Sequence, residues 1–199
     1  MCRVIVENID ELTDAAFAAG YAEMAPARRK KCDAYRFTDD KKRCVLADML
    51  VRRELARLTG CRPEEIQIRL SDTGKPYVDD AGIFFSVSHA GRLAGAAFAD
   101  REVGFDIEQI RPSPANLTKF FCTDADKTYI FGALPPEGDV TDPETLRRFF
   151  EVWTYKEAFA KLSGEGFTKR LKTVDFDKET AVFSYPEGYV ICTLTQADL

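Results

Sequence analysis

The sequence predicts an α+β protein with two halves that meet near residue 102. In each half, apolar residues first recur at helical spacing and later alternate with polar residues, as in half-buried strands. The 199 residues, 45% of them hydrophobic, are enough to bury a core in one domain or in two small subdomains. Helices and strands thus occur twice in similar order, which favours two α+β halves, although no convincing sequence repeat accompanies them.

The first half is expected to contain helices followed by strands. Helices are predicted over residues 10–24, from Pro26, and from Thr38 or Asp39 to a stop at Gly60. Val51, Leu55 and Leu58 recur on one face of the third helix, which is therefore expected to be buried. Strands are predicted over residues 66–70, 83–88, 93–99 and 103–107.

The second half is expected to be helical first and then extended. Residues 134–143 (LPPEGDVTDP) are rich in Pro, Gly and Asp, a composition typical of an exposed loop. A helix is predicted from about residue 144 to residue 162, since Ser163 and Gly164 end the apolar periodicity. Three short strands are predicted at the end of the chain, over residues 173–176, 181–185 and 189–194.

Composition and charge argue against several classes of protein. The net charge of −5 disfavours a general nucleic-acid binder, which is usually basic. The first residues lack the pattern of a secretory leader, and no apolar stretch approaches the roughly 20 residues needed to cross a bilayer. Six scattered cysteines without a CxxC pair, and a single histidine, favour reduced thiols over disulfides or zinc. We therefore expect a cytoplasmic protein that binds neither nucleic acid nor membrane.

Basic residues nevertheless cluster in the first half. They occur at 28–31 (RRKK), 41–43 (KKR) and 52–53 (RR). A locally positive pocket on an acidic protein would suit a small polyanion. Taken alone, the pattern favours the alternative interpretation, in which these residues form solvated helix faces.

Asp106 and Glu108, in VGFDIEQI, lie two positions apart in a predicted strand. Residues i and i+2 of a strand project from the same face, about 6.6 Å apart, and Phe105 and Ile107 would then face the buried side. Two carboxylates on one edge of a core strand could bind a hard cation that prefers oxygen ligands. An acidic, solvent-exposed strand face would have the same pattern.

Glu157 and Lys161, in WTYKEAFAK, are spaced as neighbours on a helix. They could form an exposed ion pair, worth only ~0.3–0.5 kcal/mol, or border the core beside Trp153. In the second case Glu157 could join Asp106 and Glu108 as the third carboxylate of a Mg²⁺ site. Such a site usually retains several waters and binds substrate phosphates.

The only histidine, His89, ends a predicted strand beside Ser88 and Gly91 in SVSHAG. A lone histidine is more often structural than functional. At the end of a strand, its imidazole could donate a hydrogen bond to a phosphate oxygen. A Ser-His-Asp hydrolase stays formally open, but the chain has no GxSxG motif to place a nucleophile.

Taken in order, these motifs resemble those of the surfactin-synthetase-activating type of 4′-phosphopantetheinyl transferase. The resemblance runs from about Pro26 to Gly166, through PARRKKC, KKRCVLADMLVRREL, TGKPYV, FSVSHAGR, VGFDIEQIRP and WTYKEAFAKLSGEG. GFDIE followed by WxxKEAxxK is much more specific than any pair of carboxylates. The resemblance implies two similar α/β subdomains in a pseudo-twofold arrangement. Residues 1–102 would serve the 3′-phosphate and adenine of coenzyme A, and residues 103–199 would carry the metal and catalytic motifs.

The resemblance also implies an activity. The family transfers the 4′-phosphopantetheine group of coenzyme A to a serine of an acyl- or peptidyl-carrier protein, using Mg²⁺ and releasing adenosine 3′,5′-bisphosphate. The chain is therefore expected to be a holo-[acyl-carrier-protein] synthase and, by analogy with two-halved relatives, a monomer. WxxKEA, with Trp153 and Ala158, resembles the subgroup that often serves peptide and polyketide synthases, and fatty-acid carriers stay open.

Individual roles follow from the resemblance, position by position. It implies metal binding by Asp106, Glu108 and Glu157, and contact of Lys161 with the pyrophosphate, so that Glu157 and Lys161 are the expected catalytic residues. Either Glu157 or a metal-bound water would accept the proton of the carrier serine. The coenzyme is expected to contact residues of the first half: Arg43 and His89 at the 3′-phosphate, Arg28 and Lys31 nearby, and Lys75, Pro76 and Ser88 at the adenine.

Two other functions stay open, a non-catalytic homologue that binds coenzyme A or a carrier protein, and a Mg²⁺-dependent phosphohydrolase. Compared with the family, the segment between GFDIE and the KE motif is longer and the tail after Gly166 is shorter. The carrier is expected to dock on a helical stretch that contains Leu117, Lys119, Phe120 and Phe121. The same residues would also fit a buried amphipathic helix.

Overall fold

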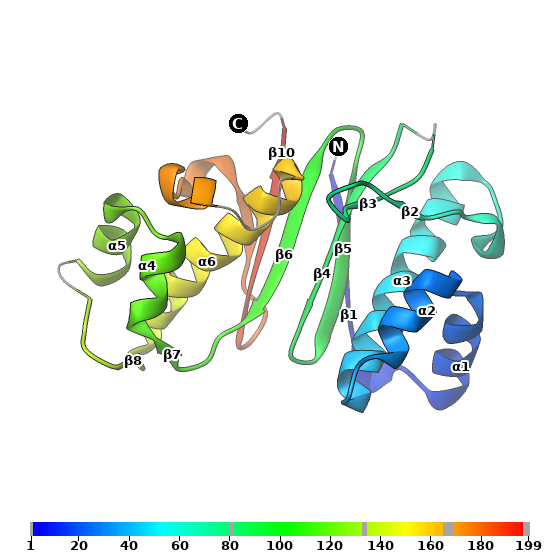
Figure 1. The fold of residues 1–199 in the computed structure, drawn as a ribbon, viewed down its shortest axis with the longest axis horizontal. Coiled ribbons are helices and arrows are strands. Elements are labelled where there is room, and N and C mark those ends of the chain that lie inside the picture. Colours follow the sequence, from blue (N-terminus) through cyan, green and yellow to red (C-terminus); the bar gives the residue numbers. More distant parts are fainter. Residues whose placement is uncertain (1, 80–81, 133–134, 165–168, 197–199) are drawn as a thin grey trace. The chain divides into compact units, whose positions relative to one another are not determined.

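The protein's structure, a computed structural model, describes residues 2–79, 82–132, 135–164 and 169–196. The chain divides into two compact units, Met1–Arg101 and Glu102–Leu199. In each unit, helices accompany a three-stranded antiparallel sheet (Figure 1). This combination of helix and sheet in two units confirms the α+β class.

The first unit begins with a strand that was not predicted, β1 (Arg3–Asn8), which pairs with β5. The sheet has the order β1-β5-β4, and β2 and β3 form a separate two-stranded ladder. Short 3₁₀ helices are η1 (Ile9–Glu11) and η2 (Pro63–Glu65). The remaining elements are α1 (Asp14–Glu23), α2 (Pro26–Asp33), α3 (Thr38–Thr59), β2 (Arg69–Leu70), β3 (Pro76–Tyr77), β4 (Phe84–Ala90) and β5 (Leu93–Ala99).

Local signals set the helix ends in this unit. The Thr13 side chain caps α1 by accepting a hydrogen bond from the Ala16 amide at 3.2 Å, so the helix starts four residues after the predicted Asp10. Pro26 occupies the first turn of α2, where its missing N–H costs nothing. Gly60 ends α3 in the left-handed conformation, as predicted.

One face of α3 packs against the sheet. Val51 and Leu55 belong to a buried cluster with Phe85 and Phe98 from β4 and β5. Leu58, predicted on the same face, is 42% exposed, so that part of the prediction is wrong. Helical spacing sets the direction of a side chain, but burial also requires a neighbouring element that covers it, and Leu58 lies in the last turn of α3.

The prediction of a strand over residues 66–70 is confirmed only for Arg69–Leu70. The carbonyl oxygen of Ile66 instead accepts a hydrogen bond from Nη1 of Arg52 at 2.8 Å. Because Arg52 is buried, this contact holds the chain after η2 against α3 rather than in a ladder.

The second unit contains a sheet of order β6-β10-β9 and a short β7-β8 ladder. Its 3₁₀ helices are η3 (Ala115–Leu117), η4 (Lys169–Thr173) and η5 (Lys178–Thr180). The remaining elements are β6 (Val103–Gln109), β7 (Ser113–Pro114), α4 (Thr118–Phe121), α5 (Asp124–Phe131), β8 (Asp139–Val140), α6 (Pro143–Ser163), β9 (Val182–Ser184) and β10 (Tyr189–Thr195).

Two predictions for this unit need correction. The strand predicted over 173–176 is absent from the described ladders, because the Phe176 amide donates instead to Oδ1 of buried Asp126 at 2.7 Å. In the loop predicted over 134–143, residue 134 lies outside the described residues, and residues 135–139 are exposed. Val140, however, is buried in β8.

The two units share a topology. In each sheet the last strand of the unit lies in the centre. It pairs on one side with the first strand of the unit and on the other with the penultimate strand. Each unit also has one long helix, α3 of 22 residues and α6 of 21, which ends at a glycine with positive φ. Neither these two helices nor any other in the described part of the chain is long and apolar enough to cross a membrane.

Gly104 lets α6 lie directly on β6. A Cβ atom at this position would be 1.9 Å from the carbonyl oxygen of Ala158 and 2.8 Å from Cβ of Leu162. Any side chain here would therefore push the helix away from the strand. This close packing sets the distance across which the side chains of the two motifs meet.

Candidate active site

Two hydrogen-bonded contacts join β6 to α6. Lys161 Nζ lies 2.7 Å from Oδ1 of Asp106, and Trp153 Nε1 donates to Oε1 of Glu108 at 2.7 Å. Trp153 and Lys161 are two helical turns apart, and Glu157 lies midway between them on the same face of α6. The helix and strand therefore run in opposite directions, with Glu157 on the helix face that carries both contacts.

Burial and mutual repulsion raise the pKa values of two carboxyl groups at this place. The pKa of Glu108 is raised to about 7, first by burial and then by the charge of Asp106, while the hydrogen bond from Trp153 opposes the rise. The pKa of Glu157 is raised by burial and by Asp106, while Lys161 opposes the rise. The carboxylates of Asp106, Glu108 and Glu157 thus lie within one another's electrostatic influence.

The chemistry of these donors fits Mg²⁺. All three are carboxylates, which hard cations prefer, and Mg²⁺ needs only one or two of them together with waters and substrate phosphates. Within the described ranges, however, no three His, Cys, Asp or Glu side chains are arranged as a group that could hold a metal. Asp106 is directed to Lys161, so cation binding would need this carboxylate to leave the ammonium, whereas Glu108 can keep the contact of its Oε1 with Trp153.

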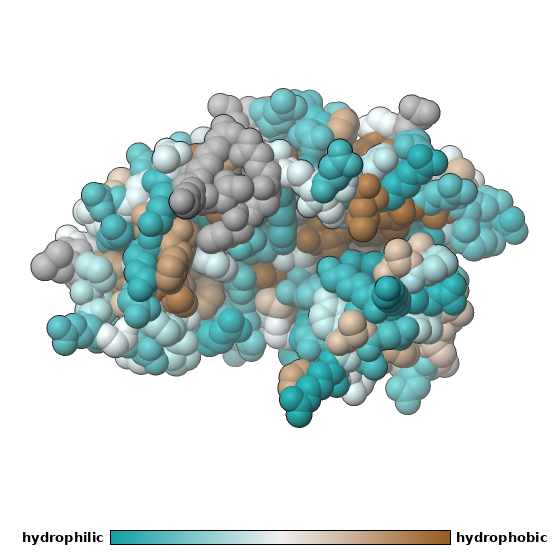
Figure 2. Space-filling model, in the orientation of Figure 1, coloured by the Kyte–Doolittle hydropathy of each residue, from teal (hydrophilic) through white to brown (hydrophobic). Residues whose placement is uncertain are grey.

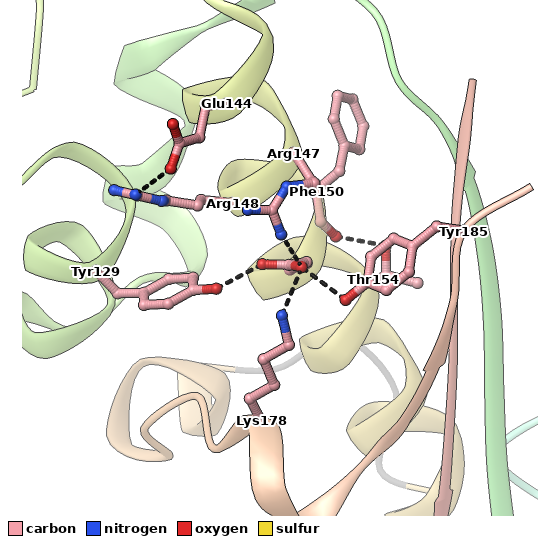
Figure 3. A network of polar contacts seen from close by, with 9 residues as sticks. Tyr129, Glu144, Arg147, Arg148, Phe150, Thr154, Lys178 and Tyr185 are labelled. Atoms are coloured by element: carbon pink, nitrogen blue, oxygen red, sulfur yellow. Dashed lines mark hydrogen bonds and ion pairs between the residues drawn. The ribbon is translucent and has the colours of Figure 1, made fainter. Parts of the chain in front are cut away.

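A second set of contacts anchors α6 through Glu151, whose side chain is fully buried. Figure 3 shows the side chains of Tyr129, Arg147, Lys178 and Tyr185 converging on one carboxylate. Its carboxylate accepts hydrogen bonds from Tyr129 Oη at 2.5 Å, Tyr185 Oη at 2.6 Å, Arg147 Nη1 at 2.7 Å and Lys178 Nζ at 2.9 Å. These donors come from α5, α6, η5 and the segment after β9. The network therefore ties α6 to elements other than β6.

In the first unit, Arg43 and His89 lie near the same turn. His89 is the penultimate residue of β4, and Gly91, with φ of 53°, connects β4 to β5. Arg43 of α3 donates from Nη1 to the carbonyl oxygen of Gly91 and pairs through Nη2 with Asp40. The guanidinium of Arg43 is thus held at the turn that follows His89.

The basic residues of α2 and α3 have unlike environments. Arg28 lies with Nε 3.9 Å from Oδ1 of Asp48, and Lys31 is exposed. Arg52 is buried and donates from Nε to Oδ2 of Asp48 at 2.7 Å, whereas Arg53 forms an exposed ion pair with a glutamate of β1. Arg52 is therefore a structural residue, and Arg53 is engaged on the surface, so only part of the basic clusters is left to bind an anion.

The residues expected at the adenine lie on neighbouring strands. Lys75 directly precedes β3, Pro76 begins it, and Ser88 lies in β4, which contacts β3. Lys75 and Pro76 are partly exposed, and Ser88 is buried.

Both units match models of one protein family. A model described as the 4′-phosphopantetheinyl transferase superfamily matches residues 102–194, and one described as the N-terminal part of a 4′-phosphopantetheinyl transferase matches residues 12–100. The chain belongs to the 4′-phosphopantetheinyl transferase superfamily. The boundary between the two matches coincides with the boundary between the two structural units.

Individual relatives in this superfamily are moderately similar to the chain. A 4′-phosphopantetheinyl transferase of Bacillus subtilis is 28% identical over 185 residues, which are 89% of the chain and 78% of that protein. The transferase Sfp of Bacillus subtilis strain 168 is 30% identical over 73% of the chain and 62% of its own length. The transferase psf-1 of Bacillus pumilus is 31% identical over 73% of the chain and 60% of its own length. The match thus spans less than two thirds of the last two proteins.

Within the superfamily motifs, sequence reasoning missed the roles of three residues. A glycine inside a strand pattern signals a close backbone approach, and this signal was available for Gly104. Trp153 was noted only as a neighbour of the core, although a half-buried indole usually finds an acceptor for its N–H. Lys156 is fully buried and binds Asp126 at 2.7 Å and the carbonyl oxygen of Leu171 at 3.0 Å. It therefore stabilises the fold, and no local pattern distinguishes it from partly exposed Lys161.

Proposed function

We propose that the chain transfers the 4′-phosphopantetheine group of coenzyme A to a serine of an acyl- or peptidyl-carrier protein. The reaction depends on Mg²⁺ and releases adenosine 3′,5′-bisphosphate. The observation that carries the proposal is the alignment of GFDIE with WTYKEAFAK, in which Lys161 contacts Asp106 and Trp153 contacts Glu108. Membership of the superfamily and the transferase activity for which the relatives are named support the same reaction.

Asp106, Glu108 and Glu157 would hold the cation, which when bound would neutralise charge on the pyrophosphate of the coenzyme. The serine oxygen forms a bond to the phosphorus that carries the pantetheine arm. The bond from that phosphorus to the bridging oxygen breaks, and the electron pair leaves with the nucleotide. Lys161 stabilises the negative charge of the departing nucleotide.

The serine proton passes to Glu157 or to a water molecule. Glu157 is a candidate because it lies on the face of α6 that carries both contacts with β6, and without a bound cation burial and the charge of Asp106 raise its pKa above the ordinary value for glutamate. A base whose pKa lies closer to neutrality is more effective at accepting a proton near pH 7. Proton transfer to Glu157 and proton transfer to a water molecule are both compatible with the sequence and with the structure.

In the first unit, Arg43 and His89 would bind the 3′-phosphate, with Arg28 and Lys31 close to it. The contacts of Arg43 with Gly91 and Asp40 support this role, because they hold a guanidinium near the strand end that carries His89. A phosphate would replace Asp40 as its anionic partner. Lys75, Pro76 and Ser88 would contact the adenine.

We further propose that the protein is a cytoplasmic monomer. Cys32, Cys44, Cys122 and Cys192 are buried thiols, as expected in a reducing compartment. The carrier could belong to peptide, polyketide or fatty-acid synthesis.

The proposal is tested by the intact mass of apo-carrier proteins after incubation with coenzyme A and Mg²⁺. The expected result is one added phosphopantetheinyl group, release of adenosine 3′,5′-bisphosphate, and loss of both with E157Q. Unmodified carriers of all three pathways, with coenzyme binding intact, would indicate a non-catalytic homologue. Release of inorganic phosphate without carrier modification would indicate a phosphohydrolase.

A further inference from the structure

Trp153 is the only tryptophan of the chain and donates its indole N–H to a carboxylate of the candidate metal site. The distance from Nε1 to Oε1 of Glu108 is 2.7 Å. This is a short, charge-assisted hydrogen bond between residues 45 positions apart in the sequence. It therefore depends on the tertiary packing of α6 on β6.

The indole ring is itself held in place by buried aromatic residues. It packs nearly perpendicular to the ring of Phe121, with ring centroids 4.7 Å apart and an angle of 79° between the planes. Phe121 is fully buried and packs in turn on Phe149, with centroids 5.6 Å apart. The direction of the indole N–H is thus set by the core of the second unit.

The backbone of Glu108 is fixed independently of its side chain. In the β6-β10 ladder, Glu108 lies opposite Val190, which is fully buried. The ladder fixes the Cα position, and the hydrogen bond from Trp153 restricts the carboxylate to one orientation. Outer hydrogen bonds of this kind orient carboxylates that bind metals.

We propose that Trp153 is a positioning residue, which holds the Glu108 carboxylate in the orientation that binds the catalytic cation. This inference rests on the proposed function, since it requires Glu108 to be a metal ligand. Trp153 binds no substrate in this role and acts only through Glu108. Loss of such a partner typically weakens metal binding 10- to 100-fold.

The test is equilibrium binding of Mn²⁺ to the full chain, measured by the loss of the free-ion electron paramagnetic resonance signal. W153F keeps an aromatic ring beside Phe121 but removes the N–H. The matched control is Y155F, which removes a hydroxyl from another α6 aromatic, 3.4 Å from Oγ1 of Thr180. We expect a roughly 10- to 100-fold weaker Mn²⁺ affinity for W153F and no change for Y155F.

A second replacement distinguishes the effect of losing the hydrogen bond from the effect of changing the shape of the ring. Because the chain has one tryptophan, a tryptophan auxotroph can replace it with 3-benzothienylalanine, which has sulfur in place of the N–H. The same loss of affinity is expected, with the melting temperature within about 3 °C of the unmodified protein. In the E108Q background, W153F should cause no further loss of affinity, since the two residues act as a unit.

The outcomes distinguish this inference from the proposed function. Weaker Mn²⁺ binding in E108Q, but unchanged binding in W153F and in the benzothienyl protein, overturns the positioning role and leaves the metal site intact. Unchanged binding in E108Q and E157Q overturns the metal site and, with it, both proposals. Weaker binding in W153F and the benzothienyl protein alike, with Y155F unchanged, supports the inference.

Discussion

Lys161 and Asp106 form an ion pair between α6 and β6, with Nζ 2.7 Å from Oδ1, and Asp106 is almost completely buried. The ammonium neutralises one of three neighbouring carboxylates. A cation bound by Asp106 would compete with the ammonium for this carboxylate. Release from Asp106 would then leave Lys161 able to contact a phosphate.

The first prediction concerns K161M. Loss of the ammonium leaves Asp106 buried without its positive partner, and we expect destabilisation by about 1–3 kcal/mol in metal-free buffer. Added Mg²⁺ should raise the melting temperature more for K161M than for the wild type, because binding to the native state stabilises it and no ammonium competes. Differential scanning fluorimetry across a Mg²⁺ series measures both effects.

K127M is the control for this prediction, because Lys127 pairs with the exposed Asp124 of α5. It should melt like the wild type at every Mg²⁺ concentration. Equal stabilisation of wild type and K161M by Mg²⁺ would show that the ammonium and the cation do not compete.

The second prediction concerns the pH dependence of stability through Glu151. Burial alone would raise its pKa, but hydrogen bonds from Tyr129, Tyr185 and Lys178 lower it below the ordinary value. A carboxyl with a lowered folded-state pKa stabilises the protein above its unfolded pKa, about 4.3, and loses this contribution as the pH falls through the folded value. E151Q should therefore be less stable than the wild type by about 1–3 kcal/mol at pH 7.

Urea denaturation between pH 7 and pH 3 measures this difference. The stability gap between E151Q and the wild type should narrow as the pH falls below about 4.3. The control is E144Q on the same helix, where Glu144 forms an exposed pair with Arg148 (Figure 3). E144Q should remain close to the wild type throughout, and a gap for E151Q that is constant with pH would contradict the prediction.

The third prediction concerns the 3′-phosphate of coenzyme A. Substitution R43M removes a charge-assisted partner worth roughly 1.5–3 kcal/mol, so coenzyme A should bind roughly 10- to 150-fold more weakly. Binding of dephospho-coenzyme A should hardly change. Isothermal titration calorimetry with both compounds measures the difference, and R53M serves as control because Arg53 pairs with Glu7 on the surface. Equal losses of affinity for the two compounds would show that Arg43 does not bind the 3′-phosphate.

The fourth prediction concerns carrier docking on α4 and the preceding η3. The residues expected there differ in burial: Phe121 is fully buried, whereas Leu117 and Phe120 are 39% and 55% exposed. Lys119 lies over the Phe120 ring, with Nζ 4.9 Å from the centroid. Figure 2 shows apolar surface beside hydrophilic residues where Figure 1 places α4. Phe121 therefore belongs to the core, and only the exposed side chains of this site can contact a carrier protein.

We expect F120A and L117A to raise the KM for the carrier several-fold, with coenzyme affinity and melting temperature unchanged. F121A should instead lose about 3–5 kcal/mol of stability. V182A is the control, because Val182 is apolar and 69% exposed but lies on β9. Steady-state modification rates on one carrier measure the effect, and a KM for F120A equal to that of V182A would exclude docking at this site.

The sequence by itself determined the elements that carry the site. Helical periodicity and end signals predicted α6 to within a residue at each end, and short apolar runs separated by turn residues predicted β4, β5 and β6. These features are local, because a cap, a glycine with positive φ or a run of apolar residues acts within a few positions. The motifs GFDIE and WxxKEAxxK likewise indicated the family, which the family models confirm.

Only the tertiary structure decided which side chains meet. Asp106 and Lys161 are 55 positions apart in the sequence. Their contact depends on the position of α6 along β6 and on how closely Gly104 allows the helix to approach the strand. The same helix carries Lys156 and Lys161, yet one ammonium is buried against Asp126 and the other reaches Asp106. Sequence spacing gives the direction of a side chain around its own helix. The partner across the interface depends on the packing of both elements, which no local pattern contains.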